Sequence, residues 1–294
     1  MEKYELVSDY RNNESLKESF NTLAMKTFEL DFRGWYNRGY WNDKYIPYSF
    51  VDEGKVISNA SVNKMSIIIN GEMYKGIQIG TVMTDENYRN QGLAQLLMQH
   101  IMKEHENTCD FMYLFANDTV LDFYPKFGFT RLNESEFSLD IAKSSIQMKM
   151  DAKVKQLTIE NDLALLEKFA KNSHVNSMIL DVKHNDSLLM FYFILVFHEA
   201  IFYVEDLETI VLMNEEEGTL HIYDIISLNA PNVEAVLANI VKKTTKKVVF
   251  YFTPDFTIEG MTATIMPNDD DALFVLTKKS LLKDNFMFPL TSHC

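Results

Sequence analysis

Apolar residues repeat at helical spacing near the start of the chain and alternate with polar residues after it. Residues 14–30 predict a helix whose apolar side faces inward, because their apolar positions lie three or four residues apart. The pair Asn70-Gly71, between two alternating segments, is a strong hairpin signal. The strands that alternation and turn residues predict are 46–52, 55–69 and 73–84. This region is therefore predicted to form an antiparallel meander.

A helix and a buried strand are predicted next. The helix after Gly92 carries its apolar residues on one side, as a helix lying on a sheet does. Residues 111–116 are nearly all apolar, which predicts a central strand parallel to residues 77–84. The strand-like residues 136–141 and the polar stretch 142–155 predict the end of a first domain near residue 145.

The second half of the chain is predicted to repeat this order of elements. The predicted helices are 160–172, 186–198 and 232–243. The predicted strands are 200–204, 208–214, 219–228 and 247–252. We therefore predict two domains, residues 1–145 and residues 146–294.

Acidic residues outnumber basic ones in this chain of 294 residues. Forty-two Asp and Glu residues stand against 28 Lys and Arg residues, which gives a formal net charge of −14. Nucleic acid is not an expected partner, because its phosphate backbone would be repelled. The electric field of this negative charge favours a cationic substrate. Alternatively, the acidic surface residues only keep the protein soluble.

The cysteines and histidines indicate neither a disulfide framework nor a metal site. The two cysteines, Cys109 and Cys294, favour a reducing, cytoplasmic setting. The seven histidines show no spacing typical of metal ligands, so no metal is expected. No secretory leader is recognised at the start, and the longest apolar run, 188–197, is about half of a membrane span. We expect no membrane association.

The segment from Tyr88 to Ala94 lies between the predicted strand 77–84 and the helix that follows. A short turn with Gly92 at its closest approach lets several backbone N–H groups point at one spot, where the helix adds its positive end. A pyrophosphate fits such a cradle. Arg89, Gly92 and Ala94 fill the pattern Gln/Arg-x-x-Gly-x-Gly/Ala, and in these residues the chain resembles the acyl-coenzyme-A site of the GNAT (GCN5-related N-acetyltransferase) superfamily.

A second motif follows at the separation that this superfamily shows. After the predicted strand 111–116 come Asn117, a short helix and the run 123–129, Phe-Tyr-Pro-Lys-Phe-Gly-Phe. The resemblance implies that Asn117 lies near the pantetheine arm and Tyr124 near the thioether. Two motifs, each in a strand-turn-helix setting, are more specific than either alone.

The resemblance implies a fold and a binding mode. The fold is α+β: two tandem acyl-CoA N-acyltransferase lobes, each a mixed, mostly antiparallel sheet flanked by helices. Two strands splay apart, and the pantetheine arm pairs with free backbone in the gap. The residues implied to bind acetyl-coenzyme A are Val82, Met83, Thr84, Arg89, Asn90, Gln91, Gly92, Leu93, Ala94 and Asn117.

An aromatic cluster follows the first predicted helix. The resemblance places this region on the acceptor side of the cleft, where Trp35, Tyr36 and Trp41 could hold a cation or a hydrophobic amine. The alternative is a satellite aromatic core beneath a short helix pair.

The second half lacks the cradle. At the equivalent junction, residues 228–232 contain neither glycine nor arginine, and Pro231 and Asn229 explain the turn by helix-start and capping preferences. We interpret this half as a degenerate, non-catalytic copy. Tandem members with one silent lobe include the enhanced-intracellular-survival type, whose third domain this chain is too short to contain.

The implied activity is an acetyl-CoA-dependent N-acetyltransferase. A primary amine of a small or peptidic, cationic acceptor attacks the thioester directly, and Tyr124 protonates the leaving thiolate; alternatively, Tyr124 only packs in the core. The general base is unassigned, because the strand 77–84 has no carboxylate and Asp85 and Glu86 read as turn residues. The hydrophobic residues 286–290 could carry the end of the chain inward to serve as a base.

A second class of function stays open at this point. The chain could be a non-catalytic acyl-CoA-binding sensor or scaffold, which the silent half and the missing base would permit. The acceptor and the oligomeric state, homo-oligomers included, are not determined by these residues.

Overall fold

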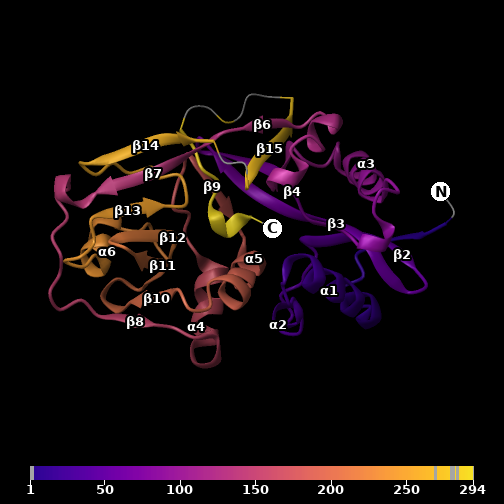
Figure 1. Ribbon diagram of the computed structural model, residues 1–294. Coiled ribbons are helices and arrows are strands. Elements are labelled where there is room, and N and C mark those ends of the chain that lie inside the picture. Colours follow the sequence, from indigo (N-terminus) through magenta and orange to yellow (C-terminus); the bar gives the residue numbers. More distant parts are fainter. Residues whose placement is uncertain (1–2, 268–269, 279–281, 283–284, 294) are drawn as a thin grey trace.

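The computed structural model describes residues 3–267, 270–278, 282 and 285–293. Two mixed sheets stand side by side, each flanked by helices (Figure 1). The first sheet has the order β1-β2-β3-β4-β5-β15-β6, with β9 also paired to β3. The second has the order β14-β7-β13-β12-β11-β10-β8. We call each sheet with its helices a lobe, and this arrangement confirms the predicted α+β class.

The bounds of the elements are as follows. The first lobe contains β1 (Glu5–Ser8), β2 (Tyr45–Asp52), β3 (Lys55–Ile69), β4 (Glu72–Thr84), β5 (Phe111–Ala116), β6 (Thr130–Leu132), β9 (Leu180–Lys183) and β15 (Ala272–Thr277), with helices α1 (Glu14–Phe28), α2 (Arg33–Tyr36) and α3 (Leu93–His105). The second lobe contains β7 (Glu134–Asp140), β8 (Val154–Gln156), β10 (Ile201–Val204), β11 (Thr209–Glu216), β12 (Thr219–Ser227), β13 (Lys247–Phe250) and β14 (Met261–Met266), with helices α4 (Ile159–Asn172), α5 (Asp186–Phe191) and α6 (Val233–Ile240).

Local sequence explains most of the first lobe. The side chain of Asn13 caps α1 by accepting a hydrogen bond from Leu16 N, and Asn70-Gly71 turns the β3–β4 hairpin with both residues at positive φ. The predicted strands 55–69 and 111–116 match β3 and β5. The predicted helix 186–198 is present from Asp186 to Val196, but it changes from an α-helix (α5) to a π-helix at Tyr192.

The two lobes exchange strands. β7 leaves the first half of the chain and pairs antiparallel with β13 in the second sheet. β15 comes from the end of the chain and lies between β5 and β6 in the first sheet. β9 also crosses from the second half, pairing with the end of β3. The sheets therefore do not divide at residue 145, and the strand 136–141, which was expected to close the first domain, belongs to the second sheet.

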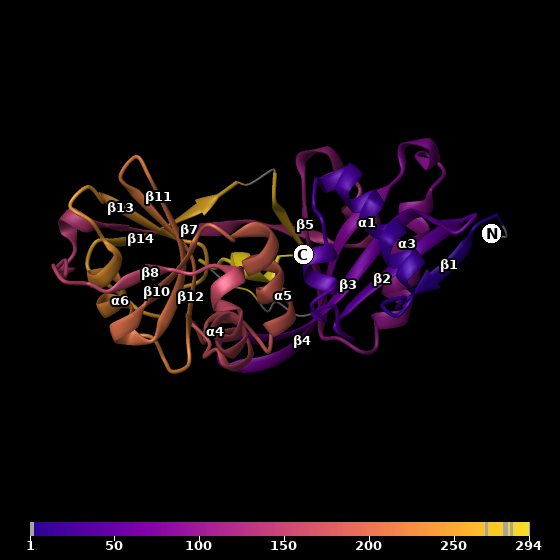
Figure 2. The ribbon, with the colours of Figure 1, turned by 90° about the horizontal axis from the view of Figure 1, so that it is seen from below.

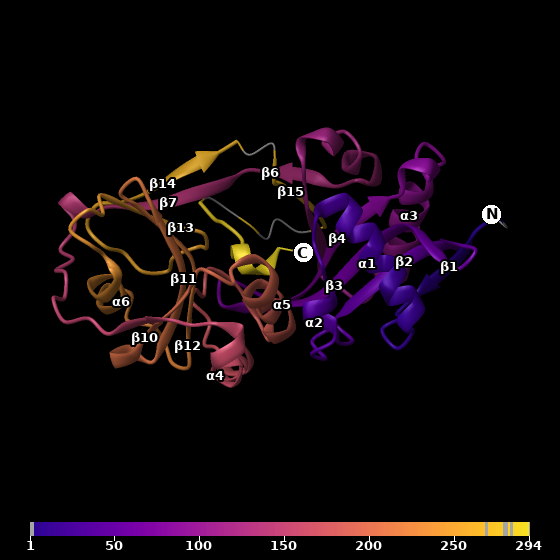
Figure 3. The ribbon, with the colours of Figure 1, turned by 60° about the horizontal axis from the view of Figure 1, so that its bottom comes forward.

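The end of the chain runs inward between the lobes (Figures 2 and 3). Phe286, Met287 and Phe288 are buried, and the ring of Phe288 stacks on Tyr113 of β5 with centroids 4.7 Å apart. We call residues 285–293 the tail. The inward course that the hydrophobic residues predicted is confirmed as far as His293, and Cys294 lies outside the described residues.

One hydrophobic core spans the boundary between the lobes. It includes Trp35 of α2, Phe191 of α5 and Phe288 of the tail. Figure 3 shows α5 beside α2, and the indole N–H of Trp35 donates to the carbonyl of Ser187 over 2.8 Å. The lobes are thus joined by exchanged strands and by a shared core.

Candidate functional site

The two central strands of the first sheet separate after a short parallel pairing. β4 pairs with β5 from Gly76 to Gln78, and β4 then continues to Thr84. The β3–β4 register shifts between Asn59 and Ser61, and Thr81 has φ of 49°. The side-chain amide of Asn59 donates to Thr81 O over 2.8 Å and holds this bulge.

A cavity of about 450 Å³ occupies the gap between these strands. The predicted site residues in its walls are Val82, Met83, Thr84, Arg89, Ala94, Asn117 and Tyr124. The structure therefore brings together both sequence motifs, which lie about thirty residues apart in the chain. Asn90, Gln91, Gly92 and Leu93 belong to the turn beside this cavity rather than to its walls.

The turn before α3 has the backbone of an anion cradle. Asn90 and Gly92 have φ of 61° and 77°, and no side chain caps the helix. A Cβ atom on Gly92 would meet nothing within 4 Å, so the space above the helix start is open. The first N–H groups of α3 therefore point into free space, together with the positive end of the helix dipole.

The neighbouring residues fix this turn in place. Arg89 Nε donates to Thr84 O over 3.3 Å, which ties the turn to the end of β4. Gln91 Oε1 accepts a hydrogen bond of 3.0 Å from the hydroxyl of Tyr4. Leu93 is buried in the core beneath α3, so its side chain anchors the helix while its backbone lies at the cradle.

Asn117 and Tyr124 lie after β5, as the second motif implies. Asn117 Oδ1 accepts from the backbone N–H of Thr119 over 3.1 Å and shapes the turn that follows. Tyr124 is 5% exposed, and burial raises the pKa of its phenol to about 12. No described residue hydrogen-bonds its hydroxyl. A phenol with this pKa is protonated at neutral pH and can donate a proton to a group in the cavity.

The comparisons with known proteins agree with this geometry. Residues 13–132 match the family model described as an acetyltransferase (GNAT) domain. Residues 13–132 therefore form a GNAT acetyltransferase domain. No curated protein matches the chain at the sequence level.

Solved structures match nearly the whole chain. A probable N-acyltransferase of unknown function from Enterococcus faecalis V583 superimposes with a TM-score of 0.61 at 12% identity, over 92% of this chain and 71% of that one. Eis1 from Mycobacterium abscessus superimposes with a TM-score of 0.55 at 10% identity, over 92% and 72% of the two chains. A GCN5-related N-acetyltransferase from Kribbella flavida gives a TM-score of 0.55 at 15% identity, over 93% and 71%. At these identities the matches establish the tandem GNAT fold.

The carboxylates beside the cradle of this GNAT domain are structural. Asp85 Oδ1 accepts from Asn87 N over 3.0 Å, and Lys26 of α1 forms ion pairs with Asp85 and Glu86. β4 offers a buried amide in place of an acid: both polar side-chain atoms of Gln78 are buried without a partner among the described residues. The described part of the chain holds no cluster of three metal-ligating side chains and no helix long and apolar enough to cross a membrane.

A titratable cluster that the sequence reasoning missed lies behind β5. The ring of His293 stacks on Phe115, whose side chain lines the cavity, and His293 Nδ1 lies 3.1 Å from Asp271 Oδ2. His293 Nε2 is buried without a partner among the described residues. Burial also raises the pKa of nearby Glu134 to about 7. Only the strand exchange and the tail bring these residues together, so no local sequence signal marks them.

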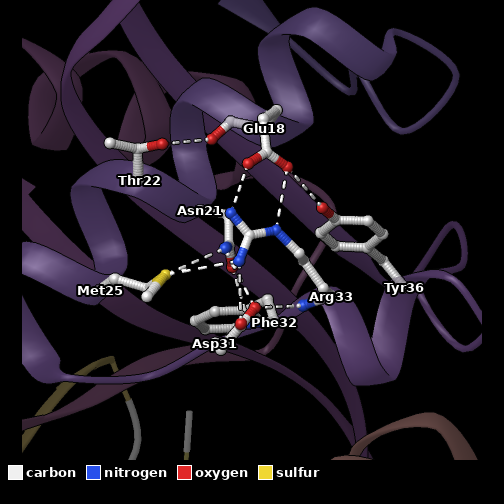
Figure 4. A network of polar contacts seen from close by, with 8 residues as sticks. All are labelled: Glu18, Asn21, Thr22, Met25, Asp31, Phe32, Arg33 and Tyr36. Atoms are coloured by element: carbon white, nitrogen blue, oxygen red, sulfur yellow. Dashed lines mark hydrogen bonds and ion pairs between the residues drawn. The ribbon is translucent and has the colours of Figure 1, made fainter.

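The predicted acceptor residues have different positions. Trp35 lines a small cavity of about 140 Å³ next to the cavity between β4 and β5. Tyr36 turns away from it: its hydroxyl donates to Glu18 Oε2, within a polar network that fastens α1 to α2 (Figure 4). Trp41 is buried in the aromatic core, and its indole N–H donates to Tyr45 O over 3.1 Å. Of the three, only Trp35 lines a described cavity.

Proposed function

We propose that the protein transfers an acetyl group from acetyl-coenzyme A to a primary amine of a small or peptidic, cationic acceptor. The observation that carries this proposal is the cavity between β4 and β5, with the uncapped α3 turn beside it and Tyr124 in its wall. We assign the activity to the predicted first domain, residues 1–145, together with β9 and β15, which complete its sheet. The rest of the predicted second domain, residues 146–294, is assigned no catalysis. The two cysteines support a cytoplasmic setting.

The proposed step is direct transfer without a covalent enzyme intermediate. The amine nitrogen attacks the thioester carbonyl, whose oxygen would accept a hydrogen bond from backbone N–H near Val82 or Met83. The carbon–sulfur bond breaks, and Tyr124 gives its proton to the leaving sulfur. The protein thus positions the two reactants and supplies one proton to the sulfur. The nitrogen attacks as the neutral amine and then loses one proton to water, from which Tyr124 is protonated again.

An acidic cavity supports a cationic acceptor. It has a volume of about 580 Å³, and its walls include Glu29, Asp31, Glu160 and Glu199 against one arginine, Arg38. Leu30 lines both this cavity and the small cavity that contains Trp35. A positively charged amine would therefore be attracted toward the small cavity, which shares Phe28 and Thr81 with the cavity between β4 and β5.

Calorimetric titration with acetyl-coenzyme A tests the cradle. Gly92→Glu places a negative charge where the pyrophosphate would lie, and we expect at least a 100-fold loss of affinity. Ala230→Glu makes the matched change in the exposed turn before α6 and should bind as the wild type does. Failure of the wild type to bind acetyl-coenzyme A would refute the proposal.

Turnover separates the enzyme from the sensor. A thiol-release screen over polyamines, aminoglycosides and amino acids should identify at least one acceptor. Tyr124→Phe is expected to lower kcat by about 10²- to 10⁴-fold, because a positioned general acid contributes that much, while acetyl-coenzyme A still binds. Full turnover in Tyr124→Phe would exclude Tyr124 as the general acid and would mean that its side chain only packs in the core. Tight binding without thiol release from any amine would favour the sensor, which the lack of a carboxylate in residues 77–84 of β4 also permits.

A further inference from the structure

A second, apolar cavity adjoins the cavity between β4 and β5 that we propose to hold the coenzyme A thioester. Its volume is about 140 Å³, and it shares two wall residues, Phe28 and Thr81, with the larger cavity. Thr81 lies at the bulge of β4, directly before Val82 and Met83, whose backbone is proposed to hold the thioester. The small cavity therefore begins where the acyl group of the donor would lie. We call it the acyl chamber.

Both lobes build the acyl chamber. Phe28 and Phe32 come from the region of α1 and α2, whereas Leu188 and Phe191 come from α5. The polar groups of the wall are few: the hydroxyl of Tyr45 lies 3.0 Å from Thr81 Oγ1, and Asn63 contributes an amide. None of the described residues in this wall carries a carboxylate, an imidazole or an amine. The chamber thus offers nothing to neutralise an ammonium group and no base to deprotonate one.

The size of the chamber sets the size of its occupant. An engineered protein cavity of about 150 Å³ lined by apolar side chains stays dry and binds benzene, a molecule of six carbons. The acyl chamber, at about 140 Å³, is similar in volume and lining. It is larger than a methyl group requires, so acetyl-coenzyme A would leave most of it unfilled.

We propose that the acyl chamber receives the hydrocarbon chain of the donor, so that the preferred donors are acyl-coenzyme A thioesters of about four to eight carbons. This inference rests on the proposed function, since it assumes that a coenzyme A thioester occupies the larger cavity. The reaction is unchanged: the carbon–nitrogen bond forms, the carbon–sulfur bond breaks and the chain stays attached to the carbonyl carbon. The acidic cavity beyond Leu30 remains available to the cationic amine.

Binding measurements with a donor series test the proposal without any acceptor. Acetyl-, butyryl-, hexanoyl-, octanoyl- and palmitoyl-coenzyme A are titrated into the wild-type protein by calorimetry. Each methylene that is fully buried is worth about 0.8 kcal/mol, or about fourfold in affinity. We expect hexanoyl-coenzyme A to bind at least tenfold more tightly than acetyl-coenzyme A, and palmitoyl-coenzyme A to gain nothing over octanoyl. Equal affinity for the acetyl and hexanoyl donors would overturn the proposal.

Two adjacent leucines of α5 provide a matched pair of variants. Leu188→Phe fills the chamber and should reduce the hexanoyl-to-acetyl affinity ratio by at least tenfold. Leu189 packs into a different core, so Leu189→Phe makes the same change outside the chamber and should keep the wild-type ratio. Leu188→Ala enlarges the chamber and should shift the optimum toward octanoyl-coenzyme A, which provides a second test if Leu188→Phe folds poorly.

The outcomes separate this proposal from the one on which it rests. No binding of acetyl-coenzyme A to the wild type would overturn the proposed function itself. Normal acetyl-coenzyme A binding with no gain for longer donors would overturn only the acyl chamber. A Leu188→Phe variant that raises KM for the amine, and keeps the wild-type donor ratio, would assign the chamber to an apolar part of the acceptor and overturn the proposal as well.

Discussion

The two lobes have similar sheets but differ in the gap beside their parallel strand pair, which forms a cavity in the first lobe and is filled in the second. In the first lobe, β4 runs past its last parallel pair at Gln78, and a cavity of about 450 Å³ lies beside it. In the second, β12 runs past its last parallel pair at Ile222, and the tail fills the equivalent space. Thr291 Oγ1 donates to Asp224 of β12 over 2.6 Å, and Leu290 N donates to Tyr251 O, just after β13.

The N-termini of α3 and α6 also differ, because only the second one is capped by a side chain. Gly92 leaves the first turn of α3 without a side-chain cap, whereas Asn232 caps α6 by accepting from Ala235 N over 3.0 Å. A capped N-terminus has already satisfied a donor that an anion would need, and an uncapped one has not. In the second lobe the filled gap and the capped helix start leave no place for the thioester and the pyrophosphate that we propose for the first lobe, while the sheet itself is retained.

Cutting the chain at residue 145 is the severest test of the two-lobe description. We expect neither residues 1–145 nor residues 146–294 to fold alone, because the first would lack β15 and β9 and the second would lack β7. Each fragment would expose strand edges and the apolar side chains that the missing strands cover. Circular dichroism and amide NMR spectra of the separate fragments measure this. A folded 1–145 fragment would show that the first lobe does not need the exchange.

Phe288→Ala tests whether the tail joins the lobes into one cooperative unit. This side chain is fully buried and stacks on Tyr113, so we expect a loss of about 3 to 5 kcal/mol in the free energy of unfolding. Urea unfolding should be followed both by far-ultraviolet circular dichroism and by the fluorescence of the two tryptophans, which lie in the first lobe.

The two transitions should coincide, because both sheets share strands and tail. Met150→Ala is the control, since Met150 is 79% exposed and its removal should change the free energy of unfolding by less than about 0.5 kcal/mol. Separate transitions in the wild type would mean that the lobes unfold independently.

Asp224→Asn is expected to have the smallest effect, and a positive one. Burial, and then the charge of Asp224, raise the pKa of Asp181 to about 7 from its ordinary value near 3.8. Between these pH values the folded state binds more protons than the unfolded state, so wild-type stability should fall as pH rises from about 4 to 7. Glu134, whose pKa is also raised to about 7, adds to this fall.

Asparagine at 224 can accept the bonds from Asn176 and Ile225 with its Oδ1 and donate from its Nδ2 to the hydroxyl of Thr291, while it removes a buried charge. We expect Asp224→Asn to stabilise the protein at pH 7 by about 1 to 2 kcal/mol and to make the fall with pH shallower. Thermal unfolding at pH 4.5, 5.5, 6.5 and 7.5 measures this, with Asp206→Asn on the surface as the control. An unchanged pH profile would show that these two carboxylates do not interact.

The sequence by itself determined the local elements of the first lobe and named the residues of its proposed site. Strands 55–69 and 111–116 could be predicted because alternation and apolar runs are local patterns that the sheet then uses. The turn at Gly92 could be predicted because positive φ strongly favours glycine. The absence of a glycine or an arginine from residues 228–232 likewise distinguished the second lobe.

Tertiary structure alone decided which strands complete each sheet and which aromatic residues line a cavity. The residues of β7 and β15 look like ordinary strands, and nothing local states which sheet edge they join, because that depends on edges formed far away in the chain. Trp35, Tyr36 and Trp41 are all large aromatic residues of one short segment. The packing of α2 against α5 nevertheless directs only Trp35 to the acyl chamber. The filled gap of the second lobe likewise depends on contacts of the tail with Asp224 and Tyr251, which are far away in the chain and leave no periodic pattern in the sequence.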